Sequence, residues 1–224
     1  MEQVFFNANL ADLEEAQHND NSTYSSINDR VWHALTPGWI ALNSDGVVST
    51  SSSLGSAGGV LIDSLGSWLG GFWKPLGYVT IIQAVLWGLY DGLKLAWSQG
   101  FEKVQCQIDN VEVYNMVSSS SSRSSPLPLV REIVSLHDRA WLVDYKLVHC
   151  EANSAAYALA KLSLDQVDAR SILGPPPDFL QNSLLCDNNR SPRCRTKKKD
   201  HMKALLRNDN ADECFNGPCI CMVP

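Results

Sequence analysis

Three short apolar segments that are separated by turns, and one long helical segment directly after them, constrain the fold of this chain most. Residues 38–46, 57–63 and 68–76 have the length and composition of β-strands, and serine- or glycine-rich turns separate them. Residues 81–99 change to the period of a helix, and Gly100 stands where a C-cap glycine is expected. The pattern predicts an antiparallel three-stranded meander followed by a helix that packs on it.

The second half of the chain continues with alternating strands and helices. Residues 103–109 alternate as a fourth strand, and residues 141–149 form a fifth. The serine run Ser118–Ser125 is predicted to be a flexible linker. Further helices are predicted over three segments, the last opened by Asn153 as N-cap residue: 111–117, 129–139 and 153–164. This order predicts an α/β fold with a mixed five-stranded sheet and helices packed on it.

One acidic residue, Asp45, stands at the carboxyl end of the first predicted strand. Side chains alternate between the faces of a strand, so Trp39, Ala41 and Asn43 share the face of Asp45. A buried carboxylate is costly to ionise unless it is paired, hydrogen-bonded or bound to a metal ion. Asp109 ends the fourth predicted strand, and the parallel connections through the helices place it near Asp45. We therefore expect Asp45 and Asp109 to form one site.

Length and composition fit one full domain with extensions, or at most two small domains. The chain has 224 residues, of which 45% are apolar, so it can build a core. Charged residues interrupt every long apolar region, so no membrane span is predicted. The start, Met1 to Phe6, lacks the basic region and long apolar run of a secretory signal. We expect a soluble intracellular protein, in the nucleus or the cytoplasm.

Charge is distributed unevenly along the chain. Residues 1–189 carry 10 Lys/Arg against 20 Asp/Glu, whereas residues 190–224 carry 8 against 4. The acidic part is a weak ligand for phosphates, because non-specific affinity for nucleic acid comes mainly from cations. The basic run Arg193 to Lys199 is a weak indication of a nuclear address or a phosphate-binding patch, although such runs are more often solvated surface.

The seven cysteines do not have the pattern of a disulfide framework, and we expect reduced thiols. Cys194, Cys214, Cys219 and Cys221 lie in the tail, but their spacing fits no common zinc-ligand pattern. Cys221 is also the first residue of the terminal Cys-Met-Val-Pro, the position of a prenylation box. A terminal proline is outside the usual set for that modification.

Several motifs occur in one order along the chain. They are Pro-Gly-Trp-Ile-x-Leu-Asn-x-Asp-Gly at 37–46, Ala-Gly-Gly-Val-x-x-Asp-x-x-Gly at 57–66, Leu-Trp-Gly-Leu-Tyr-Asp-Gly-Leu at 86–93, Val-x-x-x-Ile-Asp at 104–109, Glu-Ala-Asn-x-x-Ala-x-x-Leu-Ala at 151–160 and Pro-Pro-Pro-Asp at 175–178. In these motifs the chain resembles the plant RNase H-like domain, of the RNase H type-1 and reverse-transcriptase-like family of retrotransposon origin.

The resemblance implies a nuclease ancestry. Members of the family cut the RNA strand of RNA/DNA hybrids, with four acids that hold two divalent ions, Mg²⁺ or Mn²⁺. Two such ions activate the attacking water and stabilise the leaving oxygen of a phosphodiester. By motif, Asp45 and Asp109 occupy the two strand positions of this set of acids.

The two helical positions of the set depart from the family. Val85 stands where the family has a Glu, and Tyr157 stands where it has an Asp. No acid on the same helix faces could replace either one. The family also has a His-x-x-Arg-Glu-x-Asn pattern near the last strand, and its His and Arg become Leu147 and Cys150 here. His149 shares the strand face of Leu147 but lies about 6 to 7 Å along the strand.

The resemblance therefore implies an RNase H-like nucleic-acid-binding domain whose cleavage activity is impaired or lost. Its expected partners are an RNA/DNA hybrid or RNA, and no membrane. Asp45 and Asp109 either hold one weakly bound cation, Mg²⁺ or Mn²⁺, or remain as strand-end residues satisfied by backbone groups and water. The alternative function is a non-catalytic protein-interaction domain or a non-functional remnant of a retroelement.

Domain boundaries follow from composition and from the extent of the resemblance. We expect a flexible leader at 1–30, the RNase H-like domain at 31–165 and a family-like C-terminal extension at 166–187. The remainder, 188–224, is expected to be a disordered basic tail that contains cysteines.

Overall fold

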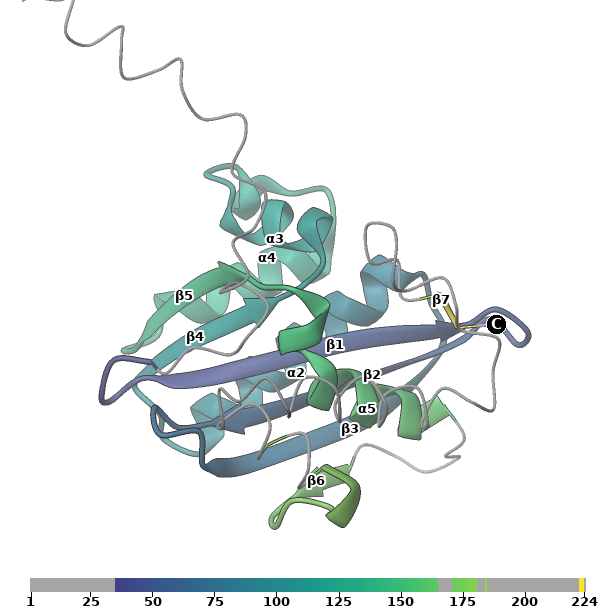
Figure 1. Ribbon diagram of the computed structural model, residues 1–224. Coiled ribbons are helices and arrows are strands. Elements are labelled where there is room, and N and C mark those ends of the chain that lie inside the picture. Colours follow the sequence, from purple (N-terminus) through teal and green to yellow (C-terminus); the bar gives the residue numbers. More distant parts are fainter. Residues whose placement is uncertain (1–34, 165–170, 181–183, 185–221, 224) are drawn as a thin grey trace, which may run out of the picture.

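A computed structural model describes residues 35–164, 171–180, 184 and 222–223. In Figure 1 a twisted sheet forms the centre of the molecule, with α2 behind it and α5 in front of it in that view. The strands are β1 (Ile40–Ser49), β2 (Leu54–Ile62), β3 (Trp68–Tyr78), β4 (Lys103–Ile108), β5 (Leu142–Leu147), β6 (Ser171–Leu173) and β7 (Met222–Val223). The strand order is β5-β4-β1-β2-β3-β6, and β7 pairs with β1.

The sheet is mixed. β1, β2 and β3 form the predicted antiparallel meander, whereas β4 is parallel to β1 and β5 is parallel to β4. Parallel neighbours need a crossover connection, and helices supply it. The helices are α2 (Ile81–Ser98), α3 (Val111–Ser118), α4 (Pro128–Ser135) and α5 (Ser154–Leu164), with 3₁₀ turns at Ser122–Ser124, Leu136–Asp138 and Cys150–Ala152.

Local sequence signals set the ends of α2, the long central helix. Thr80 is its N-cap, and the side chains of Thr80 and Gln83 form a capping box with each other's backbone N–H groups. Gly100 follows the helix with a φ of 80°, a left-handed conformation that glycine adopts without the strain of a Cβ. These signals explain why the helix predicted over 81–99 is found at Ile81–Ser98.

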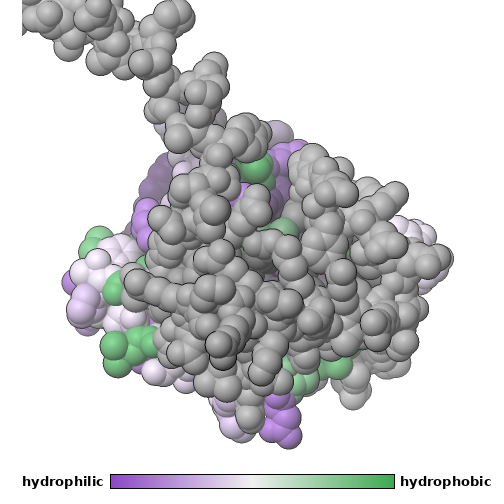
Figure 2. All heavy atoms as spheres, viewed as in Figure 1, coloured by the Kyte–Doolittle hydropathy of each residue, from purple (hydrophilic) through white to green (hydrophobic). Residues whose placement is uncertain are grey.

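Apolar residues bury both faces of the sheet. Ile40 and Leu42 of β1 belong to a cluster with α2, α3 and α4, whereas Ala41 belongs to a second cluster with α5. Alternate residues of β1 therefore serve opposite cores, as the period of a strand requires. Figure 2 shows hydrophobic side chains only at scattered places on the described part of the visible face.

Glycines allow both helices to approach the central strands closely. A Cβ at Gly46 of β1 would overlap the backbone of α2 at Ala84 and Val85. A Cβ at Gly58 of β2 would overlap the backbone nitrogen of Ala160 in α5. Gly88 of α2 shows the same contact from the helix side, because its Cβ would lie 2.8 Å from the carbonyl oxygen of Asp45. Both helices thus touch the sheet beside Asp45, one on each face.

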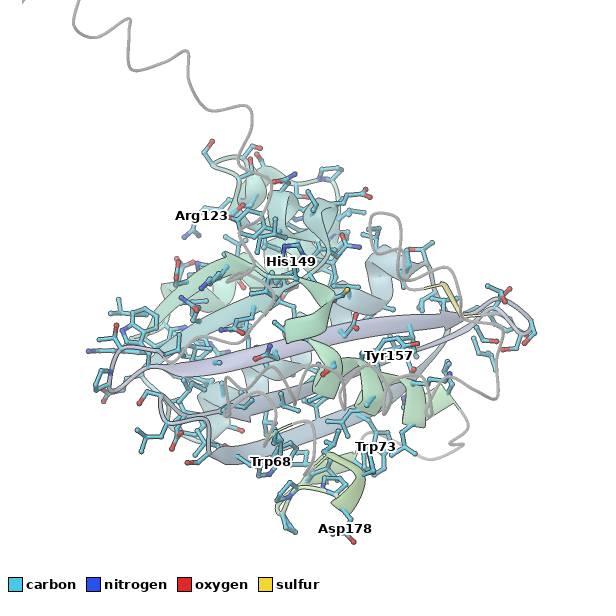
Figure 3. All side chains as sticks on the ribbon, viewed as in Figure 1. Trp68, Trp73, Arg123, His149, Tyr157 and Asp178 are labelled. Carbon is cyan, nitrogen blue, oxygen red and sulfur yellow. The ribbon has the colours of Figure 1, made fainter. Side chains whose placement is uncertain are left out.

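The predicted strands and helices are all present, with shifted ends. The prediction of five strands was too low, because the described residues also form β6 on the outer side of β3 and β7 beside the end of β1. β6 lies in the predicted extension, where Trp68 of β3 donates its indole N–H to the carbonyl of Gly174 at 2.6 Å (Figure 3). In that segment Leu180 is fully buried in the core beneath α5.

The serine run is folded rather than a flexible linker. Ser122 is buried in a 3₁₀ turn, and the hydroxyl groups of Ser119 and Ser121 lie 2.9 Å apart in hydrogen-bond contact. Arg123 in the same turn forms an ion pair with Asp138, 2.8 Å between nitrogen and oxygen. The linker was predicted from serine content alone. Composition does not show the local hydrogen bonds that serine side chains form, and here these bonds accompany a folded turn.

The predicted leader, the basic run and the tail cysteines Cys194, Cys214, Cys219 and Cys221 lie outside the described residues. Of the predicted tail, the structure describes Met222 and Val223, which form β7. None of the helices in the described part is long and apolar enough to cross a membrane.

The close contact at Gly58 predicts the effect of adding one methyl group there. Gly58→Ala forces α5 away from the sheet, and we expect a loss of about 1–3 kcal/mol in the free energy of unfolding. Gly174→Ala is the matched control, because its Cβ would meet no atom within 4 Å. Urea unfolding measures both variants. Equal stability of the two would contradict the close packing of α5.

Candidate active site

Asp45 and Asp109 lie on neighbouring parallel strands. Asp109 directly follows β4, whereas Asp45 lies within β1 and not at its carboxyl end as predicted, because β1 continues to Ser49. The last paired residues of β1 and β4 are Asn43 and Gln107, and each aspartate lies two residues further along. The charge of Asp109 is also one of the causes that raise the pKa of Asp45. The structure thus brings together the two acids that the sequence predicted to meet.

Asp45 is a buried carboxyl group with one free oxygen. Its Oδ1 accepts a hydrogen bond from the backbone N–H of Gly46 at 2.7 Å, while its Oδ2 has no partner within the described residues. Burial is the main cause that raises the pKa of Asp45 well above its ordinary value, followed by the charge of Asp109 and, more weakly, Cys150. The Gly46 hydrogen bond opposes this shift.

Asp109 has a smaller shift in the same direction. Burial raises its pKa to about 6, although a side-chain hydrogen bond with Asn153 and a bond from its own backbone lower it. Its side chain is partly accessible to water, whereas that of Asp45 is 1% exposed. Two carboxyl groups this close resist ionisation at neutral pH unless a cation compensates their charge.

Asn153 is the site residue that sequence reasoning missed. It was predicted only as a helix N-cap, and α5 does begin at the next residue. Its side chain, 1% exposed, instead donates to the carbonyl of Ser44 at 3.0 Å and bonds to Asp109. Its Oδ1 has no partner in the part of the chain described. Its place in the motif at 151–160 was the available signal.

A ladder of polar side chains runs from this site across the sheet. Asn43 donates to Gln107 at 3.1 Å, Gln107 donates to Gln105 at 3.3 Å, and Gln105 donates to Asp144 at 3.0 Å. Asn43 also donates to the carbonyl of Ala152, at 3.1 Å, just before Asn153. The ladder joins β1, β4, β5 and the 3₁₀ turn before α5. It positions the backbone around the two aspartates.

Val85 lies on α2 where that helix touches β1. The backbone of Val85 packs against Gly46, the residue that follows Asp45 in the sequence. The side chain is 2% exposed and belongs to the apolar cluster on that face. Val85 therefore offers no oxygen to a cation at this position.

Tyr157 lies on α5, on the other face of the sheet. Gly58, which α5 contacts, is the direct cross-strand partner of Asp45, so the helix lies over the aspartate's own face. Figure 3 shows Tyr157 in the first half of α5, and its side chain is 8% exposed. A buried phenol thus stands at the position where the family resemblance predicts a carboxylate.

The family's histidine and arginine have no evident replacement. Leu147 is 41% exposed, and the half-buried thiol of Cys150 contributes only a small electrostatic effect on Asp45. His149 precedes the turn to α5 (Figure 3). Among the described residues no hydrogen bond joins its side chain to either aspartate.

The residues present fit one cation better than two. Asp45 Oδ2 and Asn153 Oδ1 are buried oxygens without a donor among the described residues, and Mg²⁺ prefers such hard ligands. Within the same residues, no group of three or more His, Cys, Asp or Glu side chains is arranged to hold a metal ion. A two-ion centre needs more carboxylates than the pair Asp45 and Asp109 supplies.

Solved structures define the fold. The RNase H domain of a Mycobacterium tuberculosis protein superposes with a TM-score of 0.52 at 22% identity, covering 57% of this chain and 94% of that one. The RNase H1 of Halobacterium salinarum has a TM-score of 0.50 at 21% identity, covering 57% of this chain and 98% of its own. The chain therefore has an RNase H fold.

The family follows from the sequence. The model of the reverse transcriptase-like family matches residues 43–163, more than half of the chain, and the chain belongs to this family. An Arabidopsis thaliana protein named "Putative ribonuclease H protein" is 34% identical over 165 residues. The match covers 73% of this chain and 27% of that protein, so the chain spans about a quarter of the length of this relative.

The raised pKa values of Asp45 and Asp109 predict that the metal-free protein loses stability as pH rises. Between the ordinary carboxyl pKa of 3.8 and about 6, the folded chain holds a proton on Asp109 that the unfolded chain has released. Stability falls through this window and further above it, because the pKa of Asp45 is also raised. Since water reaches part of Asp109, we expect its share of the loss to be on the order of 1 to 2 kcal/mol.

Thermal unfolding with a chelator, across this pH range, measures the loss. Asp109→Asn should flatten the slope, while Glu112→Gln on the exposed side of α3 should leave it unchanged. A slope that is the same in wild type and Asp109→Asn would show that Asp109 ionises normally.

Proposed function

We propose that this chain is an RNase H-like domain that binds RNA/DNA hybrids or RNA and cuts them poorly or not at all. One observation carries the proposal: Asp45 and Asp109 lie on neighbouring parallel strands, while α2 and α5, which contact the sheet next to Asp45, carry Val85 and Tyr157 at the two helical positions. The scaffold of the nuclease is present, and half of the expected acids are absent.

The donor set explains why cleavage should be weak. Asp45 and Asp109, with the amide oxygen of Asn153, are the residues that would hold one divalent cation. Such an ion, when bound, would polarise a phosphate or a water molecule. The remaining side chains position this site and exclude water from Asp45, but Val85 and Tyr157 cannot hold a second ion.

Binding can persist without these acids. Proteins recognise double-helical RNA mostly through shape, the 2′-hydroxyl groups and the phosphates, which do not depend on two catalytic carboxylates. The excess of 20 Asp/Glu over 10 Lys/Arg in residues 1–189 works against phosphate binding. We therefore expect modest affinity that falls as salt is added.

Fluorescence anisotropy with labelled RNA/DNA hybrid, RNA duplex and DNA duplex at low salt tests the binding. The proposal expects the hybrid or the RNA to bind more tightly than DNA, and expects intact hybrid after incubation with Mg²⁺ or Mn²⁺. Absence of binding to hybrid and RNA would reject it. Efficient cleavage that is lost in Asp45→Asn would show instead that the site is active.

Restoring the two helical acids tests the scaffold directly. Val85→Glu together with Tyr157→Asp should produce hybrid cleavage that neither single variant shows, because four carboxylates can hold two ions. The measurement is strand cleavage in Mg²⁺, with circular dichroism to show that the variant is folded. Val85→Gln with Tyr157→Asn is the matched control, which has nearly the same shape and no new charge.

A protein-interaction domain is the second candidate, and the acidic charge of residues 1–189 favours it. The binding and cleavage experiments described above also distinguish these two proposed functions. A folded restored variant that remains inert, in a chain that binds neither hybrid nor RNA, would favour protein interaction. Cleavage by the restored variant would favour retained nucleic-acid binding.

A further inference from the structure

β5 is the strand at one margin of the sheet, and its outer side pairs with no strand of the described residues (Figure 1). Leu142 and Val148 donate their N–H groups inward, to the carbonyls of Glu102 and Ile108 on the β4 side. Because backbone groups alternate in direction along a strand, Val143, Tyr145 and Leu147 present theirs outward. The outer edge of β5 is therefore a row of donors and acceptors that can pair with another strand.

The side chains along this edge are both apolar and charged. Leu142 is 56% exposed and Leu147 is 41% exposed, which is high for leucine. Asp144 and Lys146 lie between them on one face, and neither forms an ion pair within the described chain. Gln105 of β4 donates to Asp144 at 3.0 Å, so this carboxylate has one partner on the inner side of β5.

We propose that two copies of this chain pair through β5, as antiparallel edge strands related by a two-fold axis at Tyr145. In this register Asp144 of each copy lies directly opposite Lys146 of the other. Tyr145 lies opposite itself, with its backbone groups in a hydrogen-bonded pair. The apolar residues match in the same way, Val143 with Leu147 and Leu142 with Val148.

The sequence of β5 selects this register over its neighbours. An axis at Asp144 would place two carboxylates opposite each other, and an axis at Lys146 would place two ammonium groups opposite each other, both of which are unfavourable. An axis at Val143 would place Asp144 opposite Leu142. Registers shifted by a single residue fail because inward-facing backbone groups would meet outward-facing ones. Only the axis at Tyr145 pairs opposite charges and apolar side chains together.

The same residues would discourage other partners. Charged side chains on an edge strand normally block pairing with an unrelated strand. Here the charges are complementary only to a second copy in reverse direction, which is an isologous interface. The phenol of Tyr145 is held by a 2.7 Å hydrogen bond to His137, so the residue on the axis is already ordered in one copy. The inference does not depend on nucleic-acid binding.

Sedimentation equilibrium of the full chain tests the proposal. We expect a species of twice 24.7 kDa that forms as protein concentration rises. Lys146→Asp places carboxylates opposite one another and should return the chain to a monomer, and so should Asp144→Lys. The double exchange, Asp144→Lys with Lys146→Asp, should recover the dimer because each pair is again of opposite sign. Arg131→Asp, an exposed reversal on α4, is the control and should leave the dimer intact.

A second measurement does not depend on variants. Carbodiimide joins a carboxylate to an amine in contact with it, and a mixture of light and isotope-labelled chains separates links between copies from links within one copy. We expect a mixed-mass link between Asp144 and Lys146. A chain that stays monomeric at all concentrations would overturn the proposal. A dimer that both single reversals leave unchanged, or that gives no mixed-mass link, would overturn it as well.

Discussion

The close contact of two helices with the central strands, one on each face, is the constraint on which this site depends. Gly46 of β1 allows α2 to touch the strand beside Asp45, and Gly58 of β2 allows α5 to cover the face on which Asp45 lies. Any side chain at these glycines would push a helix away. The glycine contacts therefore fix where α2, with Val85, and α5, with Tyr157, lie against the central strands.

Val85 and Tyr157 are neutral residues at the two positions where the family resemblance implies acids, and this affects the stability of the fold. Asp45 already resists ionisation because it is buried and lies near Asp109. Two further carboxylates would add repulsion that only bound cations can offset. Burying a valine instead stabilises the fold by about 1.5–3 kcal/mol. The chain therefore keeps the RNase H fold while its site holds half of the acids that the resemblance implies, and its core becomes more apolar.

Periodicity and motif order predicted most of the fold. The alternation of β1 predicted correctly that Ala41 and Leu42 face opposite cores, and the parallel crossovers predicted that Asp45 and Asp109 would meet. Sequence reasoning could not find the role of Asn153, because its hydrogen bond to Ser44 joins residues far apart in the chain. It also missed β6, which is three residues long, and the folded serine turn, where composition suggested a linker. Short pairings and local side-chain bonds leave no periodic pattern.

The number of divalent cations that the chain binds tests the central claim most directly. Calorimetric titration with Mn²⁺ at neutral pH, on wild type and on Asp45→Asn, compares the site with and without one of its two carboxylates. We predict one weakly bound ion in wild type that is lost in Asp45→Asn, with proton release mainly from Asp45, whose pKa is raised well above its ordinary value. Two ions bound in wild type, both lost in Asp45→Asn, would contradict it, because they would show a complete two-metal centre despite Val85 and Tyr157.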